Sequence, residues 1–116
     1  MKIKRFHVLS VYMEKEVRSP LRRLSRLLSI GNLWLYVISL CEKERVYAYR
    51  LPQVIKKRFG FSPSRLLCYL VLYRLEGEGF IKSDVRGKRR YYSATKKGRE
   101  ILKDAKKYLR RLVGEL

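Results

Sequence analysis

The chain has 116 residues, 47% of them hydrophobic, which fits one packed domain and excludes a disordered chain. Its 29 Lys and Arg against 10 Asp and Glu give a net charge of +19, and such a field destabilises a small fold unless a polyanion neutralises it. The composition therefore predicts a polyanionic partner, nucleic acid before an anionic membrane. With one His and no paired carboxylates or phosphate-binding loop, the sequence is not that of an enzyme.

Residues 1–18 follow neither a helical nor a strand period, and we interpret them as an N-terminal arm that packs on a dimer partner or on DNA. Ser19 and Pro20 begin a helix by the cap-then-proline rule, and Gly31-Asn32 is expected to end it. Its apolar stripe is Leu21, Leu24, Leu27 and Leu28, and its polar side is Arg22, Arg23 and Arg26. We expect this amphipathic helix to serve core packing or dimerisation in preference to a membrane surface.

The next helix, expected over residues 33–42 with Asn32 as its cap, is apolar nearly all round. It should therefore be central and buried on most sides. Cys41 and Cys68 lie in apolar runs without CxxC spacing, which predicts two reduced core thiols and neither a metal site nor a cofactor. The longest apolar run, residues 27–41, falls short of the roughly 20 residues that span a bilayer.

A short edge strand is expected at Val46 and Tyr47, followed by a second helix with Pro52 in its first turn and Gly60 after its end. Its outward side is basic: Lys56, Lys57 and Arg58. We predict that Lys56 and Lys57 contact phosphates.

The third helix begins near Ser62–Ser64 and stops at Glu76–Gly79, because Gly79 can take the left-handed conformation. A helical wheel puts Cys68, Leu72 and Leu75 in the core and Leu66, Leu70 and Tyr73 on the opposite side. That apolar outer side either touches thymine methyl groups and sugars or is covered by the N-terminal arm or a second subunit.

The DNA-contact candidates on this helix are Ser64, Arg65, Tyr69 and Tyr73, although the tyrosines could equally be structural. Arg65 carries the only charged fork of the first turn, and we predict that it takes guanine O6 and N7 together.

A hairpin follows, with strands at residues 80–85 and 89–94 joined by the turn Arg86-Gly87-Lys88. Four basic residues crowd around the one glycine and are predicted to reach the DNA backbone or minor groove: Arg86, Lys88, Arg89 and Arg90. Thr95 caps a last helix over residues 96–116. Its apolar stripe predicts a dimer interface formed by Ile101, Ala105, Tyr108, Leu109 and Leu112.

The charge is unevenly distributed along the chain. Residues 61–79 hold two basic and two acidic residues, whereas residues 43–60 hold six and one, and residues 80–95 hold five and one. The helix expected to read bases is thus neutral, which is typical of a protein whose affinity comes from phosphates.

Two segments carry a family resemblance. Residues 75–81, LEGEGFI, resemble the LEEEGLI that ends the recognition helix of PadR-like winged-helix transcriptional regulators. Residues 87–98, GKRRYYSATKKG, are similar to that family's wing and exit, GRPRKYYRLTEKG, and residues 47–51 are a weaker echo of its YGYEI. The resemblance implies a dimer through the C-terminal helix and often implies repression relieved by a small effector, for which these residues show no pocket.

The fold class expected is mainly α with a small β-wing (α+β), a winged helix-turn-helix that is dimeric through its terminal helices. Residues 19–116 would form one DNA-binding domain. The leading hypothesis is a homodimeric, sequence-specific regulator of double-stranded DNA, a repressor acting in the cytoplasm at the nucleoid. A non-specific architectural nucleic-acid-binding protein and a winged-helix protein-interaction module remain alternatives.

One Asn and one Gln beside abundant Lys and Arg favour a thermophilic source.

Overall fold

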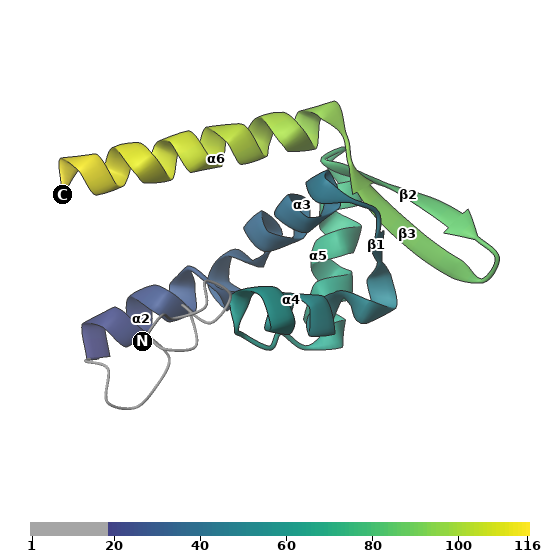
Figure 1. The fold of residues 1–116 in the computed structure, drawn as a ribbon, viewed down its shortest axis with the longest axis horizontal. Helices are drawn as coiled ribbons and strands as arrows, with labels where there is room; N and C mark the ends of the chain where they lie inside the picture. The colour runs from purple at the N-terminus through teal and green to yellow at the C-terminus, as the bar shows by residue number, and fades with distance from the viewer. Residues whose placement is uncertain (1–18) are drawn as a thin grey trace.

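The computed structural model describes residues 19–116, so the arm predicted for residues 1–18 lies outside the described part. The elements in chain order are α2 (Ser19–Leu27), the 3-10 turn η2 (Ile30–Asn32), α3 (Leu33–Lys43), β1 (Val46–Tyr47), the 3-10 turn η3 (Ala48–Arg50), α4 (Leu51–Phe59), α5 (Arg65–Gly77), β2 (Ile81–Arg86), β3 (Arg89–Ala94) and α6 (Lys96–Glu115). In Figure 1, α3, α4 and α5 form the centre, the β2–β3 hairpin projects on one side, and α2 and α6 extend on the other. This arrangement confirms the mainly helical fold with a small β-wing.

Helix α3 is the centre of the core, as predicted. Val37 and Ile38 are fully buried, and α3 packs against α5, α6 and β3. Further core residues come from every neighbouring element: Leu51 and Ile55 of α4, Cys68, Leu72 and Leu75 of α5, Ile81 of β2, Tyr92 and Ala94 of β3, and Leu102 of α6. This shared core places α5 and the hairpin at defined positions on one side of α3.

The two cysteines are free and buried. Burial raises the pKa of the Cys41 thiol to about 12 and that of Cys68 to about 11, so both thiols are neutral at physiological pH. Within residues 19–116, no three His, Cys, Asp or Glu side chains come together in a way that could hold a metal ion. The structure therefore agrees with the interpretation of Cys41 and Cys68 as core thiols.

Strand β3 is the middle strand of a three-stranded antiparallel sheet ordered β1-β3-β2. Ile81 pairs with Ala94 and Arg86 pairs with Arg89, which leaves a turn of Gly87 and Lys88. The first strand runs one residue later than predicted, because Arg86 still pairs in the ladder and Gly87, at φ 64°, makes the turn with one residue fewer. Register is thereby fixed for the whole wing.

Two expectations were wrong in the N-terminal half. Asn32 precedes α3, but its side chain makes no capping bond to that helix; its Nδ2 donates to the Leu27 carbonyl at 2.7 Å instead, which closes the turn after α2. Of the two roles expected for the leucine stripe of α2, packing in this chain's own core is not seen, since Leu24 and Leu27 are 52% and 53% exposed, and dimerisation stays a prediction. Helix α2 itself ends at Leu27, before the Gly31–Asn32 stop that was expected.

Within the described residues, one segment, Ser19–Lys43, is long and apolar enough to cross a membrane by length and composition alone. The turn η2 interrupts it, and its second half, α3, supplies the buried side chains at the centre of the fold. A buried core helix passes the same test, so packing accounts for the hydrophobicity of the α3 half of the segment.

Candidate nucleic-acid interface

Helix α5 presents one buried and one exposed apolar side. Ser64 caps it, because its Oγ accepts from the Leu67 amide at 3.1 Å. The buried side packs on the core as predicted, while Leu66, Leu70 and Tyr73 on the other side are 69%, 56% and 80% exposed. The wheel-based expectation for this helix is therefore confirmed, and its outer side is uncovered within the described residues.

Arg65 is held at the start of α5 by a residue that the sequence analysis did not single out. Its Nε and Nη2 each donate to the Tyr49 carbonyl at 3.2 Å, and its guanidinium carbon lies 4.0 Å from the centre of the Tyr49 ring. Two of its five donors are thus committed, and the others are available to a partner. The Tyr-Ala-Tyr sequence at residues 47–49 was the only available signal for this contact.

The wing has two chemically different faces, because successive residues of a strand point to opposite sides. Arg90 lies on the side of α5: its Nη1 donates to Ser83 Oγ at 2.9 Å, and Ser83 Oγ donates to Glu76 Oε2 at 2.5 Å. Arg89 lies on the opposite side, with its guanidinium carbon 4.8 Å from the centre of the Tyr47 ring. The two neighbouring arginines therefore serve different surfaces.

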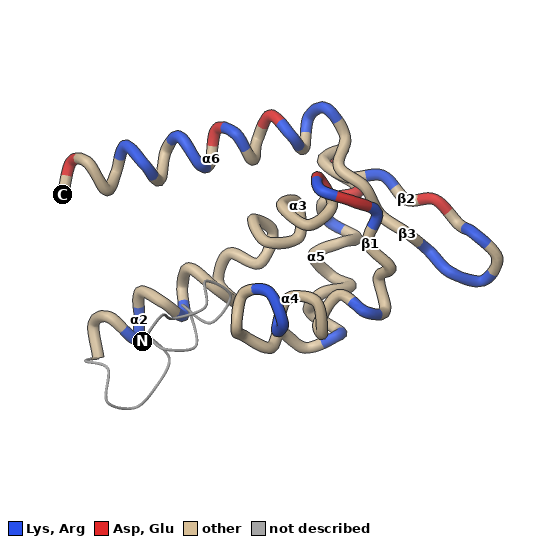
Figure 2. The backbone as a smooth tube through the Cα atoms, viewed as in Figure 1, with Lys and Arg blue, Asp and Glu red and all other residues tan. Residues whose placement is uncertain are grey.

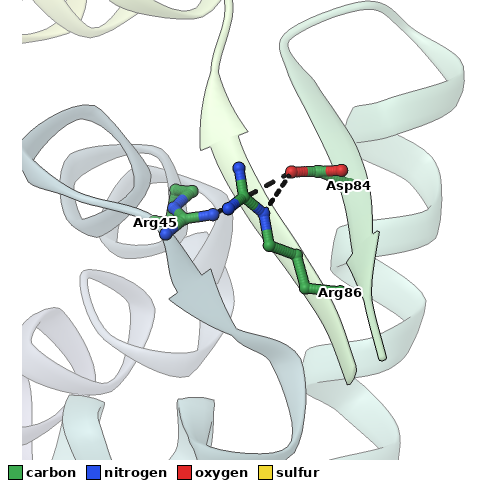
Figure 3. A network of polar contacts seen from close by, with 3 residues as sticks. All are labelled: Arg45, Asp84 and Arg86. Atoms are coloured by element: carbon green, nitrogen blue, oxygen red, sulfur yellow. Dashed lines mark hydrogen bonds and ion pairs between the residues drawn. The ribbon is translucent and has the colours of Figure 1, made fainter. Parts of the chain in front are cut away.

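Asp84 is the acidic residue of the hairpin, and two arginines converge on it (Figure 3). Its Oδ2 lies 3.0 Å from Arg86 Nε and 3.9 Å from Arg45 Nη1, and Arg45 also reaches across the Tyr91 ring at 5.3 Å. All three side chains are about half exposed, so each pair contributes at most about 1 kcal/mol. The contacts order the outer face of the wing, and Arg45, which the sequence analysis missed, belongs to it.

A groove of about 590 Å³ separates α5 from the wing. Its lining is aromatic and basic, with no acidic residue: Tyr47, Ala48, Tyr49, Tyr69, Leu70, Leu72, Tyr73, Lys88, Arg90 and Tyr92. Four predicted DNA contacts, Tyr69, Tyr73, Lys88 and Arg90, thus meet in one place. Such a combination of rings and cations is suited to an anionic ligand with flat or apolar parts.

The remaining basic candidates lie outside this groove. Lys56 and Lys57 are exposed on the last turn of α4. Figure 2 shows basic residues at the hairpin tip, on α4 and along α6, whereas α3 and α5 are mostly uncharged. Most of the cations therefore lie on elements other than α5.

Helix α6 begins with Thr95, whose Oγ1 accepts from the Gly98 amide at 3.1 Å. Of the predicted dimer residues, Ile101, Ala105 and Leu109 are half-buried, and Ile101 packs against this chain's own core, while Tyr108 and Leu112 are 65% and 42% exposed. The apolar stripe of α6 thus extends beyond the part of the helix that this chain's own core covers.

Three helices around a core, with a recognition-type helix followed by a two-stranded hairpin, define a winged helix-turn-helix protein. Residues 37–104 match the model of the Transcriptional regulator PadR-like family, and the chain belongs to that family. This confirms the predicted resemblance and the prediction that the chain is not an enzyme.

Solved structures of similar fold include regulators of the same family. A PadR family transcription regulator from Clostridium difficile R20291 is 27% identical, with TM-score 0.67, over 72% of this chain and 93% of that one. Bacillus subtilis PadR in complex with operator DNA is 24% identical, with TM-score 0.56, over 66% and 47%. The winged-helix DNA-binding protein F93 from STIV is 17% identical, with TM-score 0.63, over 73% and 94%. None of the curated proteins compared with the chain matches it.

Proposed function

We propose that the chain is a homodimeric, sequence-specific regulator of double-stranded DNA that represses transcription in the cytoplasm, at the nucleoid. The observation that carries the proposal is the exposed side of α5, which shares a groove with the wing cations Lys88 and Arg90, together with the exposed Lys56 and Lys57 on α4. A B-DNA major groove is about 12 Å wide and admits one α-helix, and the phosphates on both of its rims would then meet these cations.

Membership of a family of transcriptional regulators supports this assignment, as does the structural similarity to a regulator solved with operator DNA. In such a complex α5 would enter the major groove, with Ser64, Arg65, Tyr69 and Tyr73 near base edges. Lys56 and Lys57 would contact the backbone on one side and the wing residues Arg86, Lys88, Arg89 and Arg90 on the other.

Two exposed apolar stripes support the homodimer. Tyr108 and Leu112 on α6, and Leu24 and Leu27 on α2, are between 42% and 65% exposed, and the two helices extend from the same end of the fold (Figure 1). Sedimentation velocity at micromolar concentration should give a dimer. Tyr108→Lys together with Leu112→Lys should give a monomer, while the matched change Lys106→Ala should not alter the assembly.

Selection of bound fragments from random duplex DNA tests sequence specificity, and transcription in vitro from a template that carries the selected site tests repression. We expect one enriched motif with two related half-sites and fewer transcripts from that template. The neutral α5 keeps a non-specific architectural protein as the second candidate, since cations alone would bind any duplex. That candidate would enrich no motif, and an interaction module would retain no duplex.

A further inference from the structure

We propose that α5 recognises thymine by its 5-methyl group, through a continuous apolar face made of Leu66, Leu70 and Tyr73. This inference rests on the proposed function, because it assumes that α5 enters the major groove. It goes further by naming the chemical feature of the site that the helix reads.

Helix α5 offers few free hydrogen-bonding side chains on its exposed side. At its start, the Ser64 hydroxyl is occupied by the helix cap and Arg65 is held by Tyr49. From residue 66 to residue 73, the exposed side offers only alkyl groups and the phenol rings of Tyr69 and Tyr73. Amide and carboxylate side chains, which read adenine and cytosine, do not occur there. Beyond its first turn, this helix cannot read bases mainly by hydrogen bonds.

The exposed side of α5 is chemically complementary to thymine. Of the four bases, only thymine presents an apolar group in the major groove, and apolar side chains are its natural partners. Leu66, Leu70 and Tyr73 are 69%, 56% and 80% exposed, so each has apolar surface to bury on binding. Lys88 and Arg90 line the adjacent groove without an acidic neighbour in that lining. An apolar strip beside a cationic rim fits DNA better than it fits an apolar protein surface.

Helix geometry also sets the spacing of the bases. Leu66 and Leu70 lie four residues apart, which is about 6 Å along the helix axis. Base pairs rise about 3.4 Å, so side chains at that separation reach base pairs about two steps apart. Each half-site should therefore contain thymines, on either strand, about two steps apart.

Uracil in place of thymine tests the inference, because it removes the methyl group and keeps every hydrogen-bonding group of the base. After a motif has been selected, each thymine in it is replaced by deoxyuridine in turn, and affinity is measured for the full chain. Each contacted methyl should be worth about fourfold in affinity, the value of one buried CH₂ group. Deoxyuridine outside the motif is the base control and should change nothing.

Protein variants assign the effect to the helix. At one position of the motif, Leu70→Ala should bring the ratio of affinities for thymine-containing and uracil-containing DNA to near unity. Leu66→Ala should do the same at another position. Both side chains are exposed, so these variants should fold. Val85→Ala, on the wing and 54% exposed, is the matched control and should preserve every ratio.

The outcomes separate the two proposals. If no motif is enriched, the proposed function fails. If a motif is enriched but uracil binds as well as thymine throughout, sequence-specific binding stands and methyl recognition is overturned. If Leu66→Ala and Leu70→Ala change the sedimentation of the protein and leave all base ratios intact, the exposed face of α5 is a protein interface, and the inference is likewise overturned.

Discussion

Gly98 is buried in the first turn of α6, where that helix passes the start of the wing. A Cβ atom added there would lie 2.0 Å from the Phe80 carbonyl oxygen and 3.1 Å from its carbonyl carbon. Nonbonded carbon and oxygen atoms approach to about 3.3 Å, so Gly98→Ala requires the two backbones to separate by roughly 1.3 Å. Both neighbours are main chain, and neither can rotate out of the way.

The separation would disturb the contacts that fix α6 to the end of α5. The Thr95 amide donates to the Phe80 carbonyl at 3.1 Å, and the Thr95 hydroxyl donates to the Gly79 carbonyl at 2.6 Å. Overpacking costs about 1–3 kcal/mol and two weakened hydrogen bonds about 1 kcal/mol each, while alanine recovers about 1 kcal/mol of helix propensity. We therefore expect Gly98→Ala to lower the free energy of unfolding by about 2–4 kcal/mol, a large share of the stability of a small fold.

Urea unfolding followed by circular dichroism measures this, at one protein concentration because dimerisation would make stability concentration-dependent. Gly114→Ala is the matched control: it lies in the same helix, and its added Cβ meets nothing within 4 Å. It should leave stability unchanged or raise it by up to about 1 kcal/mol. A midpoint for Gly98→Ala equal to or above that of Gly114→Ala would refute the steric argument.

Further predictions concern binding and the thiols. The logarithm of affinity should fall against the logarithm of salt with a slope of roughly −5 to −9 for a dimer; a slope near zero would assign the charge to something other than DNA. Arg89→Ala and Arg90→Ala should each make that slope less steep by up to about one unit per subunit. If only one of the two changes has this effect, only the face of the wing that carries that arginine contacts phosphate. Arg65→Ala should lower the ratio of specific to random affinity by about ten- to a hundredfold, whereas a parallel drop in both would make it a phosphate contact. The pKa values of Cys41 and Cys68 are raised, so their contribution to stability is complete below pH 9 and is lost as pH rises towards 11 and 12; iodoacetamide at pH 8 should modify them only on unfolding.

The elements of this fold could be predicted because their signals are local. The Leu72–Leu75 spacing of α5 and the glycine of the wing turn each act within a few residues. Strand alternation even implied that Arg89 and Arg90 face opposite ways, although the sequence analysis treated them as one cluster. The contact between Arg65 and Tyr49 spans 16 residues and depends on how η3 packs against α5, which no periodicity encodes.

The leucines of α2 show a second limit. An amphipathic pattern predicts that one side of a helix will be covered, but it does not say by which surface. Leu24 and Leu27 have the spacing of core residues, yet this chain's own core is already closed by Leu33, Val37 and Ile38 of α3. Any surface that covers them therefore lies outside the described residues of one chain, and the same pattern was compatible with both core packing and dimerisation.

The separation of charge from the exposed face of α5 has a measurable consequence. Salt weakens binding through the counterions that Lys and Arg displace from phosphates, and a contact between a leucine and a methyl group displaces none. Raising salt from about 50 to about 200 mM should therefore lower total affinity by a factor of about a thousand or more. The thymine-to-uracil ratio at the positions read by Leu66 and Leu70 should stay constant over the same range. A ratio that collapses in parallel with total affinity would mean that base discrimination depends on the cations of the wing and α4, and the exposed face of α5 would then have no part in it.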